Sequence, residues 1–93
     1  LRMDSISLVM FSREGCHLCD DAWEVITQST SDFSNVEISH RMVSENPEWE
    51  AAYTDSVPVV LINDAWHSQW RVDADSLREA LVSAGARISG ESE

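Results

Sequence analysis

Two short apolar runs constrain the fold of this chain more than any other feature of its sequence. Residues 6–11 read Ile-Ser-Leu-Val-Met-Phe, and residues 58–62 read Pro-Val-Val-Leu-Ile. Nearly continuous apolar runs of this length are typical of strands that are buried on both faces of a sheet. We therefore expect residues 6–11 to form a central first strand, and residues 58–62 to form a further strand.

The stretch between the two runs carries a helix pattern followed by a strand pattern. Apolar residues around Trp23 recur at helical spacing, which predicts a helix over about residues 17–29,. The Ser/Thr/Asp cluster at residues 29–34 ends that helix, and residues 36–40 suit a second strand. Because a β-α-β unit joins parallel strands by a right-handed crossover, we expect strands 6–11 and 36–40 to run parallel.

A short helix is expected ahead of the second apolar run. Asn46 suits its N-cap, Pro47 its first helical position and Glu48 its first turn,. The helix is expected to run through Tyr53.

A hairpin is the simplest interpretation of the residues after the second apolar run. Asn63 and Asp64 can make a tight turn,. In the run that follows, successive side chains are expected to point to alternate sides of a strand. One side of that strand is expected to carry Trp66, Ser68, Trp70 and Val72, and the other His67, Gln69 and Arg71.

A last helix is expected near the C-terminal end. Asp73 or Asp75 can cap it, Leu77 and Leu81 lie on its apolar face, and Gly85 is placed to end it,. The tail over residues 88–93 is expected to fray. The resulting order is β-α-β-α-β-β-α, an α/β layer sandwich in one domain spanning residues 1–93.

The charge balance of the chain is strongly acidic. Six arginines, and no lysine, stand against seventeen Asp and Glu residues, for a formal net charge of −11. Nucleic acids and anionic membranes are poor partners for such a chain, because binding them depends on clustered cations. A basic patch on a partner protein suits it better, and the alternative is that the acidity only keeps the chain soluble.

The sequence carries no membrane-spanning or secretory pattern. There is no run of eighteen apolar residues, and no charged segment leads into an apolar one,. A soluble protein of the cytoplasm is therefore the expectation. The chain opens with Leu1 and Arg2 ahead of Met3, so whether the native chain starts at Met3 or further upstream stays open.

Cys16 and Cys19 form a C-x-x-C pair between the first strand and its helix. A bridge this short removes little entropy from the unfolded chain, so the pair is better suited to chemistry than to stability. At a helix N-terminus the dipole and free N–H groups stabilise the Cys16 thiolate, which lowers its pKa and makes it the nucleophile. Cys19, one turn on, can then attack the mixed disulfide that Cys16 forms with a substrate.

A metal site is the weaker interpretation of this cysteine pair. Zinc sites often begin with C-x-x-C, but they need further ligands. The remaining candidates are His17, His40 and His67, and the chain has no second C-x-x-C. We therefore assign no metal ligands.

Ser56-Val57-Pro58 precedes the second apolar run, where a proline belongs at the start of a strand and can adopt the cis form,. The combination of this motif with a strand-loop-helix C-x-x-C resembles the thioredoxin superfamily, and most closely its small glutaredoxin-like proteins, from Ile6 to Leu81. The resemblance implies a three-layer sandwich with a four-stranded mixed sheet. It also implies that a cis Pro58 faces the cysteines, and that the backbone of Val57 pairs with the substrate.

Two further positions enter through the same resemblance. Arg13 matches a position where glutaredoxins often carry a basic residue beside the active site, although a solvated turn arginine is the alternative. His17, inside the motif, either stabilises the Cys16 thiolate or only fills a solvated helix start. The predicted site is therefore Cys16 and Cys19 as catalytic residues, with a substrate-binding set of Arg13, His17, Val57 and Pro58.

This chain departs from the glutaredoxin pattern in two places. His-Leu stands between the cysteines in place of Pro-Tyr, and residues 71–73, Arg-Val-Asp, stand where a Gly-Gly pair is usual. Glutathione is thus a candidate co-substrate and not an established one. The Cys-His-Leu-Cys motif resembles the family of uncharacterised, minimal glutaredoxin-like proteins.

Three functions are compatible with these residues. The first is a dithiol thiol–disulfide oxidoreductase that acts on a disulfide-containing protein or a small thiol, is reduced by glutathione or a thioredoxin-type reductase, and requires no cofactor. The second is a redox-sensing or protein-interaction module with little turnover. The third is an iron–sulfur or zinc carrier that uses Cys16 with an external thiol. Trp23 and Trp49 are expected in the core, whereas Trp66 and Trp70 are either core or part of a partner surface.

Overall fold

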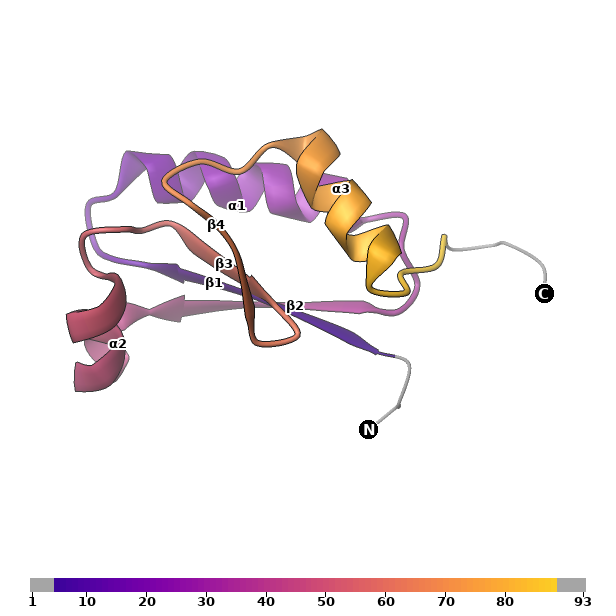
Figure 1. Ribbon diagram of the computed structural model, residues 1–93. Helices are drawn as coiled ribbons and strands as arrows, with labels where there is room; N and C mark the ends of the chain where they lie inside the picture. The colour runs from indigo at the N-terminus through magenta and orange to yellow at the C-terminus, as the bar shows by residue number, and fades with distance from the viewer. Residues whose placement is uncertain (1–4, 89–93) are drawn as a thin grey trace.

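The computed structural model describes residues 5–88 and contains one four-stranded sheet with three α-helices (Figure 1). The predicted element order is confirmed. The Met3 start and the tail after residue 88 lie outside the described residues. In chain order the elements are β1 (Ile6–Ser12), α1 (His17–Thr30), β2 (Val36–Met42), a 3-10 turn η1 (Val43–Glu45), α2 (Pro47–Tyr53), β3 (Val59–Ile62), β4 (Ala65–Gln69) and α3 (Ala74–Ser83).

The sheet has the strand order β2-β1-β3-β4 and is mixed. β1 runs parallel to β2, as the β-α-β pattern predicts, and antiparallel to β3, which in turn pairs antiparallel with β4. Leu8 of β1 is opposite Ile38 on one side and Ile62 on the other. β1 is therefore the central strand that its apolar sequence predicts.

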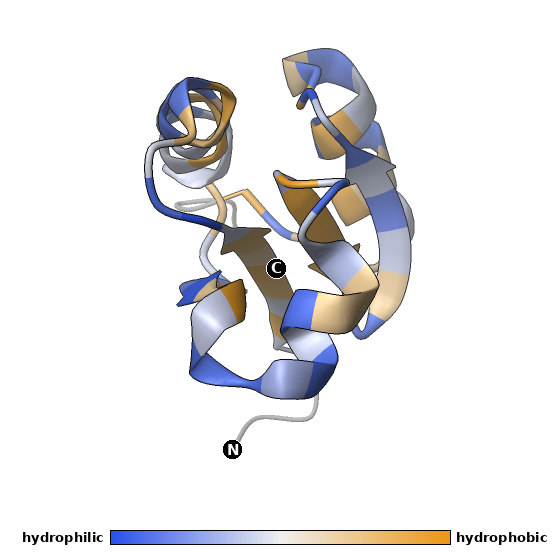
Figure 2. Ribbon diagram, turned by 90° about the vertical axis from the view of Figure 1, so that its left-hand side faces the viewer, coloured by the Kyte–Doolittle hydropathy of each residue, from blue (hydrophilic) through white to orange (hydrophobic). Residues whose placement is uncertain are grey.

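Helices cover both faces of this sheet. α1 and α3 lie over one face, and the side chains that meet there are fully buried: Ile6, Leu8, Met10, Ile26, Leu77 and Leu81. Phe11 points to the opposite face and packs against Trp49 and Tyr53 of α2, with ring centroids 5.0 and 4.6 Å away. Figure 2 shows the hydrophobic strands enclosed between the three helices. Burial of this apolar surface is the main force that holds the three layers together.

The helix caps and the hairpin turn follow the sequence closely. Asn46 Oδ1 accepts the Glu48 N–H at 2.8 Å, and Asp73 Oδ2 accepts the Ser76 N–H at 2.8 Å, so Asp73 and not Asp75 caps α3. Asn63 and Asp64 both have positive φ, 50° and 68°, as a two-residue hairpin turn requires,. The predicted turn and caps are confirmed.

The last strand differs from its predicted alternation. Val60 pairs with Ser68 but Leu61 pairs with Trp66, so His67 is an extra residue in a β-bulge. Because Val60 and Leu61 point to opposite faces, Trp66 and Ser68 do so too, and the prediction that they share a side is wrong. The strand also ends at Gln69 rather than continuing to Val72.

Two smaller expectations need correction, and the alternative left open for Trp66 and Trp70 is decided. Trp23 and Trp49 pack against the core but are only partly buried. Trp66 and Trp70 are 50% and 53% exposed, which places neither in the core. Ile88 forms an isolated antiparallel bridge with Phe33, so the expected fraying does not begin there.

Candidate functional site

The cysteine pair lies at the N-terminus of α1, where the sequence places it. Cys16 is the N-cap residue in an extended conformation, and its Sγ accepts the backbone N–H of Cys19 at 3.1 Å. The two cysteines are joined by a disulfide, with their Cα atoms 5.2 Å apart. Cys19 is only 3% exposed, whereas Cys16 is partly exposed. Cys16 is therefore the sulfur that an external thiol or disulfide can reach.

The turn that leads into Cys16 carries two of the predicted substrate-binding residues near it. Gly15 has a φ of +76°, a conformation that lets the chain turn sharply into the helix,. Arg13 is exposed in this turn and has no hydrogen-bond or ion-pair partner among residues 5–88. His17, the first residue of α1, is also exposed. Both side chains are free to meet a substrate.

The Val57–Pro58 peptide bond is cis. Phe11 of β1 pairs with Val59 of β3, so Val57 and Pro58 lie at the end of the sheet where β1 leads into the cysteine turn. Val57 is 6% exposed. The loop is also tied to the residue after β4, because the Trp70 N–H donates to the carbonyl oxygens of Ser56 at 3.2 Å and Pro58 at 2.9 Å. The structure thus brings the two predicted motifs together at one end of the sheet.

A hydrogen bond between buried Ser12 and exposed His40 anchors β1 just before the cysteine turn. The hydroxyl of Ser12, which is 2% exposed, is hydrogen-bonded to His40 Nε2 and lies 3.4 Å from Met42 Sδ. The His40 ring stacks on Trp23 of α1 at 5.0 Å. His40 therefore links β2, β1 and α1. Sequence reasoning missed this role, because the contact joins strands 28 residues apart.

Within residues 5–88, no three His, Cys, Asp or Glu side chains lie close enough together to hold a metal ion. The three histidines are placed separately: His17 opens α1, His40 contacts Ser12, and His67 sits in the bulge of β4. Burial lowers the pKa of His67 from its ordinary value. Over the same described range, no helix combines the length and apolar character that crossing a membrane would need.

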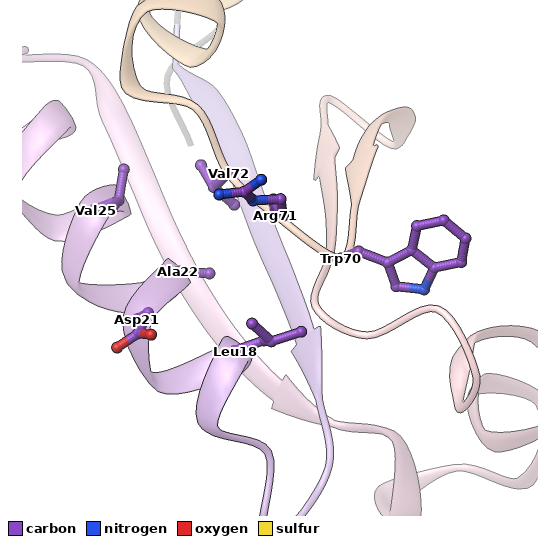
Figure 3. Close-up of a pocket in the computed structure, with 7 residues that line it drawn as sticks. All are labelled: Leu18, Asp21, Ala22, Val25, Trp70, Arg71 and Val72. Carbon is purple, nitrogen blue, oxygen red and sulfur yellow. The ribbon is translucent and has the colours of Figure 1, made fainter.

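A groove lies between α1 and the segment that joins β4 to α3 (Figure 3). Its volume is about 170 Å³, and it is lined by Leu18, Asp21, Ala22, Val25, Trp70, Arg71 and Val72. One lining residue, Leu18, stands between the two cysteines in the sequence. The sequence did not predict this groove. The one signal it held was the pair of bulky residues, Arg71 and Val72, at positions where glutaredoxins have glycine.

These features together define a protein of the thioredoxin fold. A solved protein from Nitrosomonas europaea matches the structure with a TM-score of 0.70 at 23% identity, over 86% of this chain and 95% of the other. A mutant thioredoxin from Halobacterium salinarum matches with a TM-score of 0.67 at 18% identity, over 90% of this chain and 78% of the other. At such low identity these two likenesses concern the fold alone.

The sequence narrows the class further. The family described as "Glutaredoxin-like domain (DUF836)" matches residues 7–82, and the chain belongs to that family. A structural-genomics target protein from X. campestris is 29% identical, with a TM-score of 0.67, over 82% of this chain and 96% of the other. An uncharacterised protein of Mycobacterium tuberculosis is 30% identical over 77 residues, 78% of this chain and 79% of that protein.

Proposed function

We propose that this protein is a thiol–disulfide oxidoreductase that works by a dithiol mechanism, with Cys16 as the nucleophile and Cys19 as the resolving cysteine. One observation carries the proposal: the partly exposed Cys16 sulfur caps α1 and accepts the Cys19 N–H at 3.1 Å. The Cys19 N–H and the helix dipole, both directed at this sulfur, favour its thiolate form once the disulfide is reduced.

The proposed cycle consists of two exchange steps that together transfer two electrons. In the first step the Cys16 thiolate attacks one sulfur of the substrate disulfide, forms a mixed disulfide and releases the first substrate thiol. In the second step the Cys19 thiolate attacks the Cys16 sulfur and releases the second substrate thiol. The cysteine pair is left as the disulfide that the structure contains, and two external thiols or one dithiol reduce it again.

The substrate-binding roles rest on position. Val57, at the end of the sheet where β1 leads into Cys16, and the adjoining cis Pro58 are proposed to hold the substrate chain. Arg13 is proposed to attract an anionic group of the substrate, and His17 to stabilise the Cys16 thiolate. Both are exposed near the reactive sulfur.

The partners follow from the same chemistry. A disulfide-containing protein or a small mixed disulfide is the proposed substrate, and glutathione or a thioredoxin-type reductase is the proposed source of electrons. The two exchange steps themselves need no metal or nucleotide. We propose the cytoplasm as the place of action, in an electron-transport role, because thiols are kept reduced there.

Two assays separate the candidate reductants. One measures reduction of hydroxyethyl disulfide with glutathione, and the other measures reduction of insulin disulfides with a thioredoxin-type reductase. We expect turnover in at least one assay, abolished in Cys16→Ser. The proposal fails if wild type and Cys16→Ser are equally inactive in both, and a redox-sensing or interaction module would then be the better description.

A metal assay tests the carrier function that the sequence left open. Purified protein is analysed for iron and zinc, and its visible and near-ultraviolet absorbance is recorded. Metal that is present in the wild type and lost in Cys16→Ser would favour an iron–sulfur or zinc carrier over the oxidoreductase.

A further inference from the structure

Trp70 has a backbone conformation that does not suit its side chain. Its φ is +69°, in the left-handed region that glycine adopts readily and a bulky residue does not,. Hydrogen bonds from its N–H to the carbonyls of Ser56 and Pro58 hold the backbone there. A strained residue maintained beside a reactive site points to a role in function.

The indole of Trp70 is fixed and yet open to solvent. Its ring N–H donates to the carbonyl oxygen of Asp55 at 3.1 Å, which orients the ring over the loop that leads to Pro58. The residue is nonetheless 53% exposed. Figure 3 shows the indole extending away from α1, with the groove on the other side of the Trp70 backbone. A rigid exposed aromatic ring gives apolar contact area at little entropic cost.

Leu18 lies on the α1 side of the groove. It extends from α1 toward the segment that contains Trp70, and it is 52% exposed (Figure 3). Ala22, Val25 and Val72 add apolar lining. Across the groove from Leu18 lies the Trp70 backbone, and the exposed indole lies beyond it (Figure 3).

We infer that Leu18, the groove and the Trp70 indole beyond it form one docking surface for an extended segment of a substrate protein. That segment carries an apolar residue next to its disulfide cysteine and a net positive charge. The inference rests on the proposed disulfide exchange and adds to it the class of substrate. Trp70 is the residue that determines specificity.

Charge supports a basic protein segment in preference to glutathione. The chain has a net charge of −11; Asp20 and Asp21 are exposed near the start of α1, and Asp21 lines the groove. Arg71 contributes one opposing charge to the lining. Glutathione carries two carboxylates and has no apolar side chain that could fill a groove lined by Leu18 and Val72. A lysine-containing segment with an aromatic residue complements both the charge and the apolar lining.

A single-turnover assay with four disulfides tests this. The reduced protein is mixed with the disulfide-linked dimer of acetyl-Lys-Phe-Cys-Ala-amide, with the same peptide carrying Gly in place of Phe, with one carrying Glu in place of Lys, or with glutathione disulfide. We expect the Lys-Phe peptide to react at least about fivefold faster than the Gly peptide, because its ring packs against the apolar surface that Leu18 and Trp70 provide. The Glu peptide and glutathione disulfide are expected to react more slowly than the Lys-Phe peptide.

Variants assign the preference to the proposed surface. Trp70→Gly removes the indole and suits the left-handed backbone, and Leu18→Ser removes the apolar side chain on the α1 side of the groove from an exposed helix position. Both are expected to reduce the Phe-over-Gly ratio to below about twofold. Trp66→Ala is the matched control, because Trp66 is equally exposed, at 50%, and does not line the groove. Its ratio should equal that of the wild type.

The outcomes separate this inference from the proposed function. If the wild type reduces all four disulfides at similar rates, or if Trp70→Gly and Leu18→Ser keep the Phe preference, the docking surface is wrong and the oxidoreductase stands. If glutathione disulfide reacts fastest, glutathione is the substrate class and the inference is overturned. If the wild type reduces none of the four, the proposed function fails and the docking surface falls with it.

Discussion

The backbone N–H of Cys19 donates a hydrogen bond to the sulfur of Cys16 across 3.1 Å. This contact aims a helix N–H at one sulfur only, and the same sulfur is the one that is partly exposed. The two cysteines of the motif therefore differ in electrostatics and in access.

We expect the thiol pKa of Cys16 to be lower than that of Cys19 in the reduced protein, because the helix N-terminus stabilises the Cys16 thiolate. Cys16→Ser and Cys19→Ser each leave a single thiol. Measuring the rate of iodoacetamide alkylation against pH for both variants shows which of the two thiols has the lower pKa. A faster reaction near neutral pH in Cys16→Ser, where only Cys19 remains, would contradict it.

The two cysteines should also differ in the adducts that they form. With hydroxyethyl disulfide, Cys19→Ser should accumulate a stable mixed disulfide on Cys16, because no second thiol can displace it. The wild type should pass to the internal disulfide without accumulating the adduct, and Cys16→Ser should react little. Mass spectrometry of acid-quenched samples measures all three. A persistent adduct on Cys19 alone would reverse the assigned roles.

Much of this fold could be predicted because its signals are local. The apolar run at residues 6–11 is typical of a buried central strand, and the caps at Asn46 and Asp73 satisfy N–H groups two or three residues away,. Cys16 could be placed for the same reason, since the helix that follows it has its own apolar pattern.

The features that escaped prediction depend on contacts distant in sequence. The bulge at His67 is set by the pairing of β4 with β3, and alternation alone cannot reveal it. The left-handed Trp70 is held by the Ser56 and Pro58 carbonyls, against its own conformational preference. The Ser12–His40 contact joins two strands that only the fold makes neighbours. The groove depends on Trp70 and therefore could not be predicted either.

Asp73 is a stability determinant that can be tested separately from the cysteines. Its carboxylate accepts the Ser76 N–H at 2.8 Å at the start of α3, a contact that lowers the pKa of Asp73. Asp73→Ala should lower the free energy of unfolding, measured by urea denaturation of the oxidised protein, because alanine cannot accept the N–H that the cap satisfies. Asp75→Ala, in the same turn but outside the cap, is the control and should cost less. If both variants lose the same free energy of unfolding, the interaction of a negative charge with the helix dipole explains the effect of Asp73, and the capping hydrogen bond does not.

The ion pair between α3 and the turn that follows α1 predicts a pH dependence. Arg78 binds Asp32 through two hydrogen bonds of 2.8 and 3.1 Å, which lower the pKa of Asp32 below its ordinary value of 3.8. The pair therefore stabilises the fold above about pH 4, and this contribution is lost as the pH falls through the folded-state pKa. Both side chains are over one-third exposed, so solvent screens the pair and its effect on stability at neutral pH should be small,.

Asp32→Asn is the variant that tests this pH dependence. Its unfolding free energy should fall less steeply than that of the wild type below about pH 4, because an amide side chain at this position has no proton to gain. The remaining slope includes the contribution of Asp73, whose pKa is also lowered. Urea denaturation across that pH range gives both curves, and parallel curves would contradict the assigned role of the pair.

The turn between β3 and β4 offers a stabilising substitution. Asn63 and Asp64 both have positive φ, and Asn63 Oδ1 also accepts the Ser7 N–H at 3.0 Å, so Asn63 has a side-chain role whereas Asp64 has none in the described contacts. Asp64→Gly keeps Asn63 and gives the Asn-Gly pair that such turns favour. We expect a gain of a few tenths to about 1 kcal/mol in the free energy of unfolding, because glycine adopts a positive φ without steric cost. Asn63→Gly is the comparison. It relieves the same kind of strain but loses the contact to Ser7, so it should stabilise less, and the reverse order in urea denaturation would show that the side-chain contact contributes little.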